Sequence, residues 1–321
     1  MMPLVTVFIP CYNQAKVLGR AINSVLSQTY MNLEIIVGDD CSTDETSLIV
    51  QTFLKDSRIR YERSYKNLGR VANYRRGLME LALGEWYVNL DGDDYYDNRN
   101  YIEQAISLAQ ERSDSVLVFG RQKYLQSNSG KIIIKGEPKV NRWSEGKEFL
   151  LNYFTINEGI PHMSALYRVS IARTLNLFSN DIVFADAEAM LRLLPWGAVG
   201  YSAEFSGIWV FHGENDSHNL NIDLRLKNLK FITEPAIFFI QSGVFNSIEA
   251  FRWQYHGLVR LIRETLHFYL DNFEYHRAFQ FWLISTKHWS FMDRLQIWFS
   301  LRLLLRLIFP WFSKLKTWMG N

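Results

Sequence analysis

The chain has 321 residues, which is enough for one large or two modest domains. Its net charge of +2 gives no support to a polyanionic partner, so no nucleic acid is expected. The two cysteines, Cys11 and Cys41, make no disulfide framework and have no metal-ligand spacing, which favours small packing residues in a cytosolic protein. The N-terminus lacks a signal-peptide pattern, and no apolar run of about 18 residues predicts a membrane span.

The N-terminal part of the chain alternates between short apolar runs and amphipathic stretches. The apolar, β-branched runs predict strands at 4–9, 33–38, 58–63 and 85–90. Stretches with one apolar face predict helices at 14–28, from about 42 to 54, and at 70–83. Strands that alternate with helices are typical of a doubly wound, mostly parallel α/β sheet. In such a sheet, ligands bind beyond the carboxyl ends of the strands.

Polar side chains follow each of these four predicted strands. They are Tyr12 and Asn13 after the first, Asp39, Asp40, Ser42 and Asp44 after the second, Asn67 after the third, and Asp91, Asp93 and Asp94 after the fourth. We therefore expect four loops to meet in one crevice, and the pattern favours a nucleotide site there.

The alternation is less regular in the rest of the chain. The sequence predicts a helix at 98–112, a strand at 116–120, a hairpin at 122–135 turning at 128–130, a strand and short helix at 162–170, a helix at 186–194, and two strands separated by a turn at 199–204 and 206–212. Nearly all of 220–309 has a helical pattern. We expect an α/β domain at 1–215, with a nucleotide-binding half at 1–97 and an acceptor half at 98–215, followed by a helical region at 216–321.

Four aspartates crowd into seven residues after the fourth predicted strand: Asp91, Asp93, Asp94 and Asp97. Carboxylates this close ionise less readily, a cost that a bound cation or full exposure to water offsets. Their oxygens suit Mg²⁺ or Mn²⁺, and Gly92 lets the backbone turn alternate carboxylates toward one point. The alternative is a solvated acidic turn, since Asp and Gly are favoured turn residues.

The sequence GDDCSTD at 38–44 supplies a second group of carboxylates. At the end of a strand, Asp40 can accept the N–H of a base or bind ribose hydroxyls, and the following helix N-terminus favours anions. We also expect Ser42 to cap that helix, with Glu45 completing a capping box. Ser42 and Asp44 would then shape the loop.

Four motifs, in order and each after a predicted strand, carry a resemblance: IPCYN at 9–13, DDCSTD at 39–44, NLG at 67–69 and LDGDD at 90–94. Over about residues 3–215 the chain resembles the family 2 glycosyltransferases, which have the GT-A fold. The resemblance implies a nucleotide-sugar donor, usually UDP-linked, a divalent metal ion on the diphosphate, and inversion at the anomeric carbon.

The resemblance also assigns residues. It implies that Pro10 and Tyr12 line the base pocket and that Asp40 binds the uracil edge. It places Asp91 near the ribose and makes Asp93 or Asp94 a ligand of Mg²⁺ or Mn²⁺. Asn73 and Arg76, one turn apart on the helix after Gly69, suit contact with the donor, and Arg76 as a plain surface side chain is the alternative. The full donor-binding set is Pro10, Tyr12, Asn13, Asp39, Asp40, Asn67, Gly69, Asn73, Arg76, Asp91 and Gly92.

The stretch FADAEAMLR at 184–192 supplies a candidate catalytic base. An inverting transfer needs a group that takes the proton of the acceptor hydroxyl. Family members carry it as an Asp at the head of a helix, often as Asp-x-Glu followed by Leu-Arg, and Asp186 matches that place. Glu188 is a competitor, because many members write the motif Glu-Asp whereas Ala185 precedes Asp186 here. Without the resemblance, Asp186 is explained as an acidic residue that stabilises a helix N-terminus.

Two histidines are further candidates. His212 follows a predicted strand, as does a histidine that closes on the diphosphate or metal in many family members. Imidazole binds manganese acceptably, so we expect His212 among the metal ligands. Its alternative is a polar loop histidine. His162 lies near the expected acceptor side and is a candidate for acceptor contact.

The segment 289–318 combines cations with a strongly apolar composition. Arg294, Trp298, Arg302 and Arg306 follow i, i+4 spacing among Leu, Ile, Phe and Trp. This pattern is typical of a helix in the membrane interface, with apolar side chains in lipid and cations at anionic headgroups. The alternatives are a core helix packed on the preceding ones and an oligomer contact.

These features predict an inverting glycosyltransferase at the cytoplasmic face of a membrane, transferring sugar from a UDP-sugar to a lipid-linked saccharide in surface polysaccharide or glycan assembly. One alternative is a glycosyltransferase with a soluble or protein acceptor. Another is a non-catalytic nucleotide-sugar-binding protein with a docking tail, against which the intact Asp93 and Asp186 argue. A nucleotidyltransferase is disfavoured because the sequence has no Gly-rich triphosphate loop with Lys or Arg.

Overall fold

The computed structural model describes residues 2–155, 159–212, 219–290 and 297. The chain divides into two compact units, Met1–Asn215 and Asp216–Asn321. Each unit has its own apolar core. The predicted membrane-associating segment at 289–318 lies outside the described residues, apart from Trp289, Ser290 and Ile297.

The described strands of the first unit form one sheet in the order β3-β2-β1-β4-β9-β6-β10-β5, with β7 beside β6 and β8 beside β10. Their bounds are β1 Val5–Cys11, β2 Leu33–Asp39, β3 Ile59–Arg63, β4 Trp86–Asn89, β5 Tyr95–Tyr96, β6 Ser115–Gln126, β7 Lys131–Ile133, β8 Trp143–Glu145, β9 Leu166–Arg168 and β10 Ala198–Phe211. The pairs β1–β2, β1–β4, β2–β3 and β6–β10 are parallel, and the short strand β9 joins β4 to β6 by antiparallel pairing. The predicted α/β fold with a mostly parallel sheet is confirmed.

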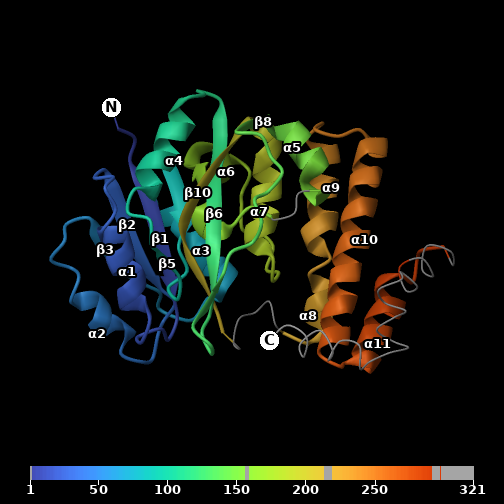
Figure 1. Ribbon diagram of the computed structural model, residues 1–321, viewed down its shortest axis with the longest axis horizontal. Helices are drawn as coiled ribbons and strands as arrows, with labels where there is room; N and C mark the ends of the chain where they lie inside the picture. The colour runs from blue at the N-terminus through green and yellow to red at the C-terminus, as the bar shows by residue number, and fades with distance from the viewer. Residues whose placement is uncertain (1, 156–158, 213–218, 291–296, 298–321) are drawn as a thin grey trace. The chain divides into compact units, whose positions relative to one another are not determined.

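Helices cover both faces of this sheet, as Figure 1 shows. They are α1 Leu18–Leu26, α2 Thr46–Gln51, α3 Arg70–Arg76, α4 Tyr101–Gln110, α5 Gly146–Asn152, α6 Val169–Thr174 and α7 Ala185–Leu193. Every residue of β1 is buried, which is why its sequence is an almost continuous apolar run. Alternate side chains such as Val7 and Ile9 join α1 and α4 in one core, while Phe8 lies on the opposite face, beneath Gly77.

The strand register brings the ends of the first four strands to one edge. Cys11 pairs with Asp39, Asp39 pairs with Arg63, and Phe8 pairs with Asn89. The loops that leave these strands therefore begin at similar heights along the sheet, which is the arrangement that the sequence predicts for a binding crevice.

Two local predictions are wrong. The two strands predicted at 199–204 and 206–212 are a single strand, β10, which ends at Phe211, because pairing with β6 continues through a bulge between Tyr201 and Gly207. Ser42 is not a helix cap, since α2 begins at Thr46 and its N-cap position, Glu45, makes no side-chain cap bond. The hairpin at 122–135 is confirmed, with β6 paired to β7 and Gly130 in the left-handed region at φ 67°.

The described part of the second unit is helical, with α8 Ile222–Lys227, α9 Lys230–Gln241, α10 Ser247–Asp271 and α11 Tyr275–Ser285. Helix α10 begins with a capping box between Asn246 and Glu249 and packs against α9 and α11. The apolar core of the second unit includes Leu266 and Tyr269 of α10 and Phe281 of α11. Among the residues described, none of the helices has both the length and the apolar character that crossing a bilayer requires.

Gly77, directly after the last residue of α3, gives a test of how tightly this part of the chain packs on the sheet. A Cβ at this position would lie 2.7 Å from three ring atoms of Phe8, which is fully buried. Overpacking of this kind costs about 1–3 kcal/mol, and the better helix propensity of alanine returns up to about 1 kcal/mol. We expect Gly77→Ala to lower the free energy of unfolding by about 1–2 kcal/mol, measured by urea denaturation. Gly136→Ala is the control, because no atom lies within 4 Å of its Cβ position. Equal midpoints for both variants would contradict the expectation.

Candidate active site

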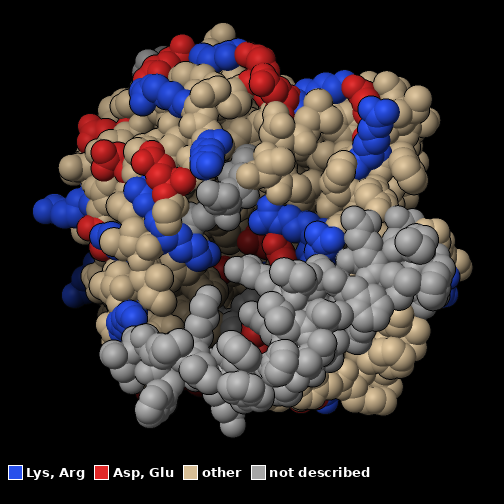
Figure 2. Space-filling model, turned by 45° about the vertical axis from the view of Figure 1, so that its right-hand side comes forward, with Lys and Arg blue, Asp and Glu red and all other residues tan. Residues whose placement is uncertain are grey.

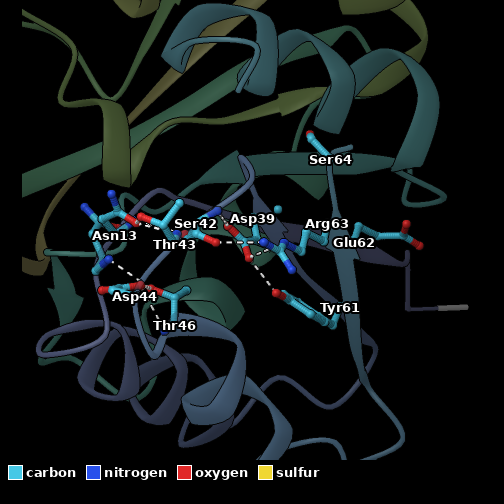
Figure 3. Close-up of polar contacts among 12 residues, drawn as sticks. Asn13, Asp39, Ser42, Thr43, Asp44, Thr46, Tyr61, Glu62, Arg63 and Ser64 are labelled. Atoms are coloured by element: carbon cyan, nitrogen blue, oxygen red, sulfur yellow. Dashed lines mark hydrogen bonds and ion pairs between the residues drawn. The ribbon is translucent and has the colours of Figure 1, made fainter. Parts of the chain in front are cut away.

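The loops after β1 and β2 are fastened to each other by side chains, as Figure 3 shows. Asn13, at φ 53°, donates its N–H to Ser42 Oγ at 2.9 Å and accepts the Thr43 N–H at 2.8 Å on its Oδ1. Asp44 accepts the Thr46 N–H at 3.0 Å. Ser42 and Asp44 therefore shape this loop, as the sequence indicates, and Asn13 joins them rather than pointing freely into solvent.

Asp39 is fully buried, and both of its oxygens are engaged (Figure 3). Its Oδ1 accepts the Ser42 N–H at 2.8 Å, and its Oδ2 accepts the Tyr61 hydroxyl. Arg63 Nε lies 3.6 Å from the same Oδ2, and Arg63 also donates to the Ser42 carbonyl at 2.8 Å. The Asp39 carboxylate thus holds the β2 loop against β3. Tyr61 and Arg63 were not among the candidate site residues named from the sequence, although their position in the third predicted strand, near its end, could have indicated them.

Asp40 organises the loop that precedes α3. Its two oxygens accept the N–H groups of Leu68 and Gly69, each at 2.8 Å. Asn67 Oδ1 also accepts the Gly69 N–H, at 3.0 Å. Gly69 has φ 89°, a conformation that other residues rarely adopt, so this glycine is required by the turn. Asp40, Asn67 and Gly69 are brought together as one structure, and contact of Asp40 with uracil stays a prediction.

Asn73 and Arg76 pack α3 onto the sheet. Buried Asn73 donates to the Gly38 carbonyl at 2.7 Å. Arg76 donates to Ser64 Oγ at 3.0 Å and to the Glu62 carbonyl at 3.3 Å. Both side chains therefore contact β2, β3 or the loop after β3, and their predicted contact with the donor remains untested.

The end of β1 approaches the acidic loop closely. A Cβ on Gly92 would lie 3.2 Å from the Pro10 carbonyl oxygen and 2.2 Å from Gln14 Oε1, so glycine permits this approach. Pro10 is buried within β1, whereas the Tyr12 side chain is 46% exposed. An exposed aromatic ring at this edge is available to stack on a base, which suits the predicted role of Tyr12.

The acidic loop 91–94 faces the end of β10. Asp93 Oδ2 lies 2.8 Å from His212 Nε2, a contact across 119 residues of sequence. Arg20 donates to the Asp93 carbonyl at 2.8 Å and lies over the Tyr95 ring, 4.2 Å from its centroid. The structure therefore brings together two of the three predicted metal ligands, Asp93 and His212, and Arg20 holds the loop that carries Asp93.

The neighbouring carboxyl groups are more buried. Asp94 is only 3% exposed, and its Oδ1 accepts the Val210 N–H at 2.8 Å. Burial raises the pKa of Asp94 well above its usual range, and the charges of Asp93 and Asp91 raise it further. Asp94 joins the loop to β10, and its part in metal binding stays a prediction.

Asp91 is partly buried, and its Oδ1 accepts the Tyr74 hydroxyl at 2.7 Å. Burial raises the pKa of Asp91, the nearby His162 lowers it, and Asp93 raises it again. The crowding of charge that the sequence shows is thus real in the fold, because Asp91, Asp93 and Asp94 all interact. A cation would offset their mutual repulsion.

The residues present fit a divalent ion of the expected kind. Asp93 and His212 offer one carboxylate and one imidazole, and Mg²⁺ or Mn²⁺ sites commonly combine one or two protein ligands with substrate phosphates. Within the described residues, no group of three or more His, Cys, Asp or Glu side chains could hold a metal by itself. The diphosphate would therefore have to supply the remaining ligands.

Asp186 and Glu188 lie in the first turn of α7 in different surroundings. Glu188 is fully buried and bonds Arg192 Nε at 2.5 Å and Asn180 Nδ2 at 3.0 Å. Asp186 is partly exposed, and its charge adds to burial in raising the pKa of Tyr167. Between the two carboxylates, Asp186 is the one that solvent and a substrate hydroxyl can reach.

Arg70, Tyr74 and His162 also border this region, and sequence reasoning missed the first two. Arg70 and Tyr74 are four residues apart on α3, with the guanidinium 5.5 Å from the ring centroid. His162 packs against Tyr74 at 5.2 Å between ring centroids. Neither ring nitrogen of His162 has a hydrogen-bond partner in the described part of the chain. The i, i+4 spacing of Arg70 and Tyr74 was the available signal.

Comparison with known proteins gives the class. Residues 6–175, more than half of the chain, match the glycosyl transferase family 2, and the chain belongs to that family.

Two curated relatives are similar over part of their length. The glycosyltransferase GlyG of Streptococcus pneumoniae is 33% identical over 129 residues, which is 40% of this chain and 42% of that protein. GalNAc(5)-diNAcBac-PP-undecaprenol beta-1,3-glucosyltransferase of Campylobacter jejuni is 42% identical over 96 residues, 29% of this chain and 30% of that protein. The chain thus spans less than half the length of either relative.

Two solved structures share the fold. Staphylococcus aureus TarS 1–349, in complex with UDP-GlcNAc, has a TM-score of 0.56 at 17% identity, over 87% of this chain and 88% of that chain. The mannosyltransferase PcManGT of Pyrobaculum calidifontis, in complex with GDP-Man and Mn²⁺, has a TM-score of 0.59 at 15% identity, over 100% of this chain and 84% of that chain. At these identities the likeness concerns the fold alone, and that fold is the predicted GT-A fold.

Proposed function

We propose that this protein is an inverting glycosyltransferase that moves a sugar from a UDP-sugar to an acceptor hydroxyl with the help of Mg²⁺ or Mn²⁺. The observation that carries the proposal is the contact between Asp93 and His212, at 2.8 Å, beside the partly buried Asp91. The Asp93 carboxylate and the His212 imidazole lie together at the edge of the sheet where the parallel strands end.

The donor would bind across the ends of β1, β2 and β4. The base would lie against the exposed ring of Tyr12, near the loop that Asp40 organises. The ribose would lie toward Asp91, and the diphosphate toward Asp93 and His212. The complex of TarS with UDP-GlcNAc supports a UDP-sugar, and PcManGT with GDP-Man and Mn²⁺ supports a divalent ion.

The chemistry of transfer would be divided between the two carboxylate sites. A divalent ion held by Asp93 and His212 would supply Lewis-acid stabilisation of the departing diphosphate. Asp186 accepts the proton of the acceptor hydroxyl as that oxygen attacks the anomeric carbon from the side opposite the diphosphate. The attack inverts the configuration, and oxocarbenium character develops at the sugar, as in glycoside hydrolysis.

The acceptor we propose is a lipid-linked saccharide, at the cytoplasmic face of a membrane. The Campylobacter jejuni relative is named for a polyprenyl-diphosphate-linked substrate, which supports this acceptor class. Helices α9 and α10 also expose large apolar side chains, including Ile237, Ile240 and Phe251. Figure 2 shows one face on which basic and acidic side chains of the described residues are interspersed.

The metal assignment is tested through UDP binding. Asp93→Asn should abolish the gain in UDP affinity that Mn²⁺ gives the wild type, because it removes the carboxylate charge beside His212. Isothermal titration calorimetry of UDP, with and without Mn²⁺, measures this gain in affinity. Asp97→Asn is the control from the same acidic cluster, since Asp97 bonds Lys123 at 2.6 Å instead. A wild type whose UDP affinity ignores both Mn²⁺ and Mg²⁺ would show the metal assignment to be wrong.

The base assignment is tested through turnover. UDP-GlcNAc, UDP-glucose, UDP-galactose and GDP-mannose are screened for release of nucleotide diphosphate, with water or simple sugars as acceptor. With the active donor, Asp186→Asn should lose about 10²- to 10⁴-fold in kcat while UDP affinity is kept, because only proton transfer is affected. Glu188→Gln should instead destabilise the fold, since it breaks a buried ion pair with Arg192. If Glu188→Gln folded stably but were inactive, and Asp186→Asn were fully active, Glu188 would be the base in place of Asp186.

Membrane association is tested with vesicles. Between Lys287 and Asn321 the sequence carries six basic residues and one acidic residue, and each cation near an anionic leaflet contributes about 1 kcal/mol that salt screens. Binding to phosphatidylglycerol vesicles should therefore weaken with salt without vanishing, because apolar burial adds a salt-insensitive contribution. Cosedimentation measures it, with phosphatidylcholine vesicles as the control. A full-length protein that ignores both kinds of vesicle would rule the proposal out.

A further inference from the structure

Arg70 is the first residue of α3, directly after the Gly69 turn that Asp40 holds. Its guanidinium reaches across to the segment that leads into α7. There Nη2 donates to the Val183 carbonyl at 2.8 Å and to the Ile182 carbonyl at 3.4 Å. These carbonyls stand three and four residues before Asp186. One side chain from the nucleotide-binding half therefore holds the entry to the helix that carries the candidate base.

The same guanidinium lies over the Tyr74 ring, 5.5 Å from its centroid. The Tyr74 hydroxyl in turn donates to Asp91 Oδ1 at 2.7 Å. A continuous set of contacts thus runs from Asp91, through Tyr74 and Arg70, to the 182–183 segment. Burial acts to lower the pKa of Arg70, but Tyr74 and the carboxylates of Asp186 and Asp91 outweigh it and raise that pKa. The charges of Asp186 and Asp91 both act on this guanidinium, which is a cation like that of any arginine.

Arginine has specific advantages here. Its planar fork can donate to two carbonyls while it lies over a ring, which a lysine ammonium on a flexible stem cannot do. Further along α7, the Glu188 pair with Arg192 and the bond from Asn180 fix the interior side of the helix. Arg70 fixes the approach to it from α3.

We propose that Arg70 is a positioning residue for the catalytic base, fixing the 182–186 segment against α3 so that Asp186 stands at a set distance from the donor site. The inference rests on the proposed function, because it takes Asp186 as the base. Arg70 need not touch the substrate in this role.

The experiment compares Arg70→Lys, Arg70→Gln and the control Arg75→Gln. Arg75 lies on the same helix but bonds the side chain of Asn176 at the surface. Three quantities are measured: hydrogen–deuterium exchange of residues 181–188, UDP affinity, and release of UDP from UDP-GlcNAc or another donor that is turned over. Lysine keeps the positive charge, so Arg70→Lys tests the geometry with the charge retained. Urea denaturation reports whether each variant folds.

In Arg70→Lys, we expect the backbone amides of 181–188 to exchange faster while UDP affinity is kept. We expect kcat to fall about 100-fold, the size of effect that a displacement near 1 Å produces. Arg75→Gln should match the wild type in all three. In the Asp186→Asn background, Arg70→Lys should cost nothing more, because a residue that acts through Asp186 has no effect once the base is gone.

Several outcomes would overturn the inference. Unchanged exchange at 181–188 in both Arg70 variants would do so without any activity measurement. So would a loss of UDP affinity in step with turnover, or a further loss of turnover in the double variant. The failures are separable: an active Asp186→Asn contradicts the proposed base, whereas an inactive Asp186→Asn with a fully active Arg70→Lys contradicts the positioning role alone.

Discussion

The candidate site depends on one constraint, the parallel pairing of β1 with β2 on one side and β4 on the other. This pairing sends the loops after three strands off the same edge of the sheet, so that groups far apart in sequence meet there. A shift of one residue in β1 would turn its side chains to the opposite faces, moving Phe8 from its place beneath Gly77 into the α1–α4 core. The fit of Phe8 against Gly38 and Gly77 therefore helps to fix the register, and through it the position of the site.

The carboxylates at this edge are used in two ways. Asp39 and Asp40 are buried and accept hydrogen bonds from backbone N–H groups, Asp39 within its own loop and Asp40 from the loop before α3, so these bonds replace lost hydration. Asp93 and Asp186 are less buried and remain accessible. The loops can hold a precise geometry without a ligand because the first pair supplies internal acceptors. The second pair leaves its carboxylates accessible, as the proposed metal and base roles require.

Local patterns predicted the strands, the sheet and the convergence of loops, because apolar periodicity and strand-end polarity are properties of contiguous residues. The split of 199–212 into two strands was wrong because the bulge near Tyr201 keeps its pairing with β6, which no local pattern records. The cap at Ser42 was wrong because its hydroxyl accepts from Asn13 on another loop. The contacts of Arg70 with Ile182 and Val183, across more than a hundred residues, likewise depend on tertiary structure.

The crowding of aspartates at 91–94 in the sequence does not indicate which of them is accessible to a ligand. The backbone turns at Gly92 and Asp93, where the Asp94 N–H donates to the Asp91 carbonyl, and Asp93 meets His212 while Asp94 turns inward to the Val210 N–H. Burial favours the neutral form of Asp94, which lessens its repulsion of Asp93. Both contacts anchor the loop to the end of β10, the strand that also pairs with β6. The position of Asp93 is thus set by the acidic loop after β4 and by the end of β10, and a ligand bound to both Asp93 and His212 would contact both elements.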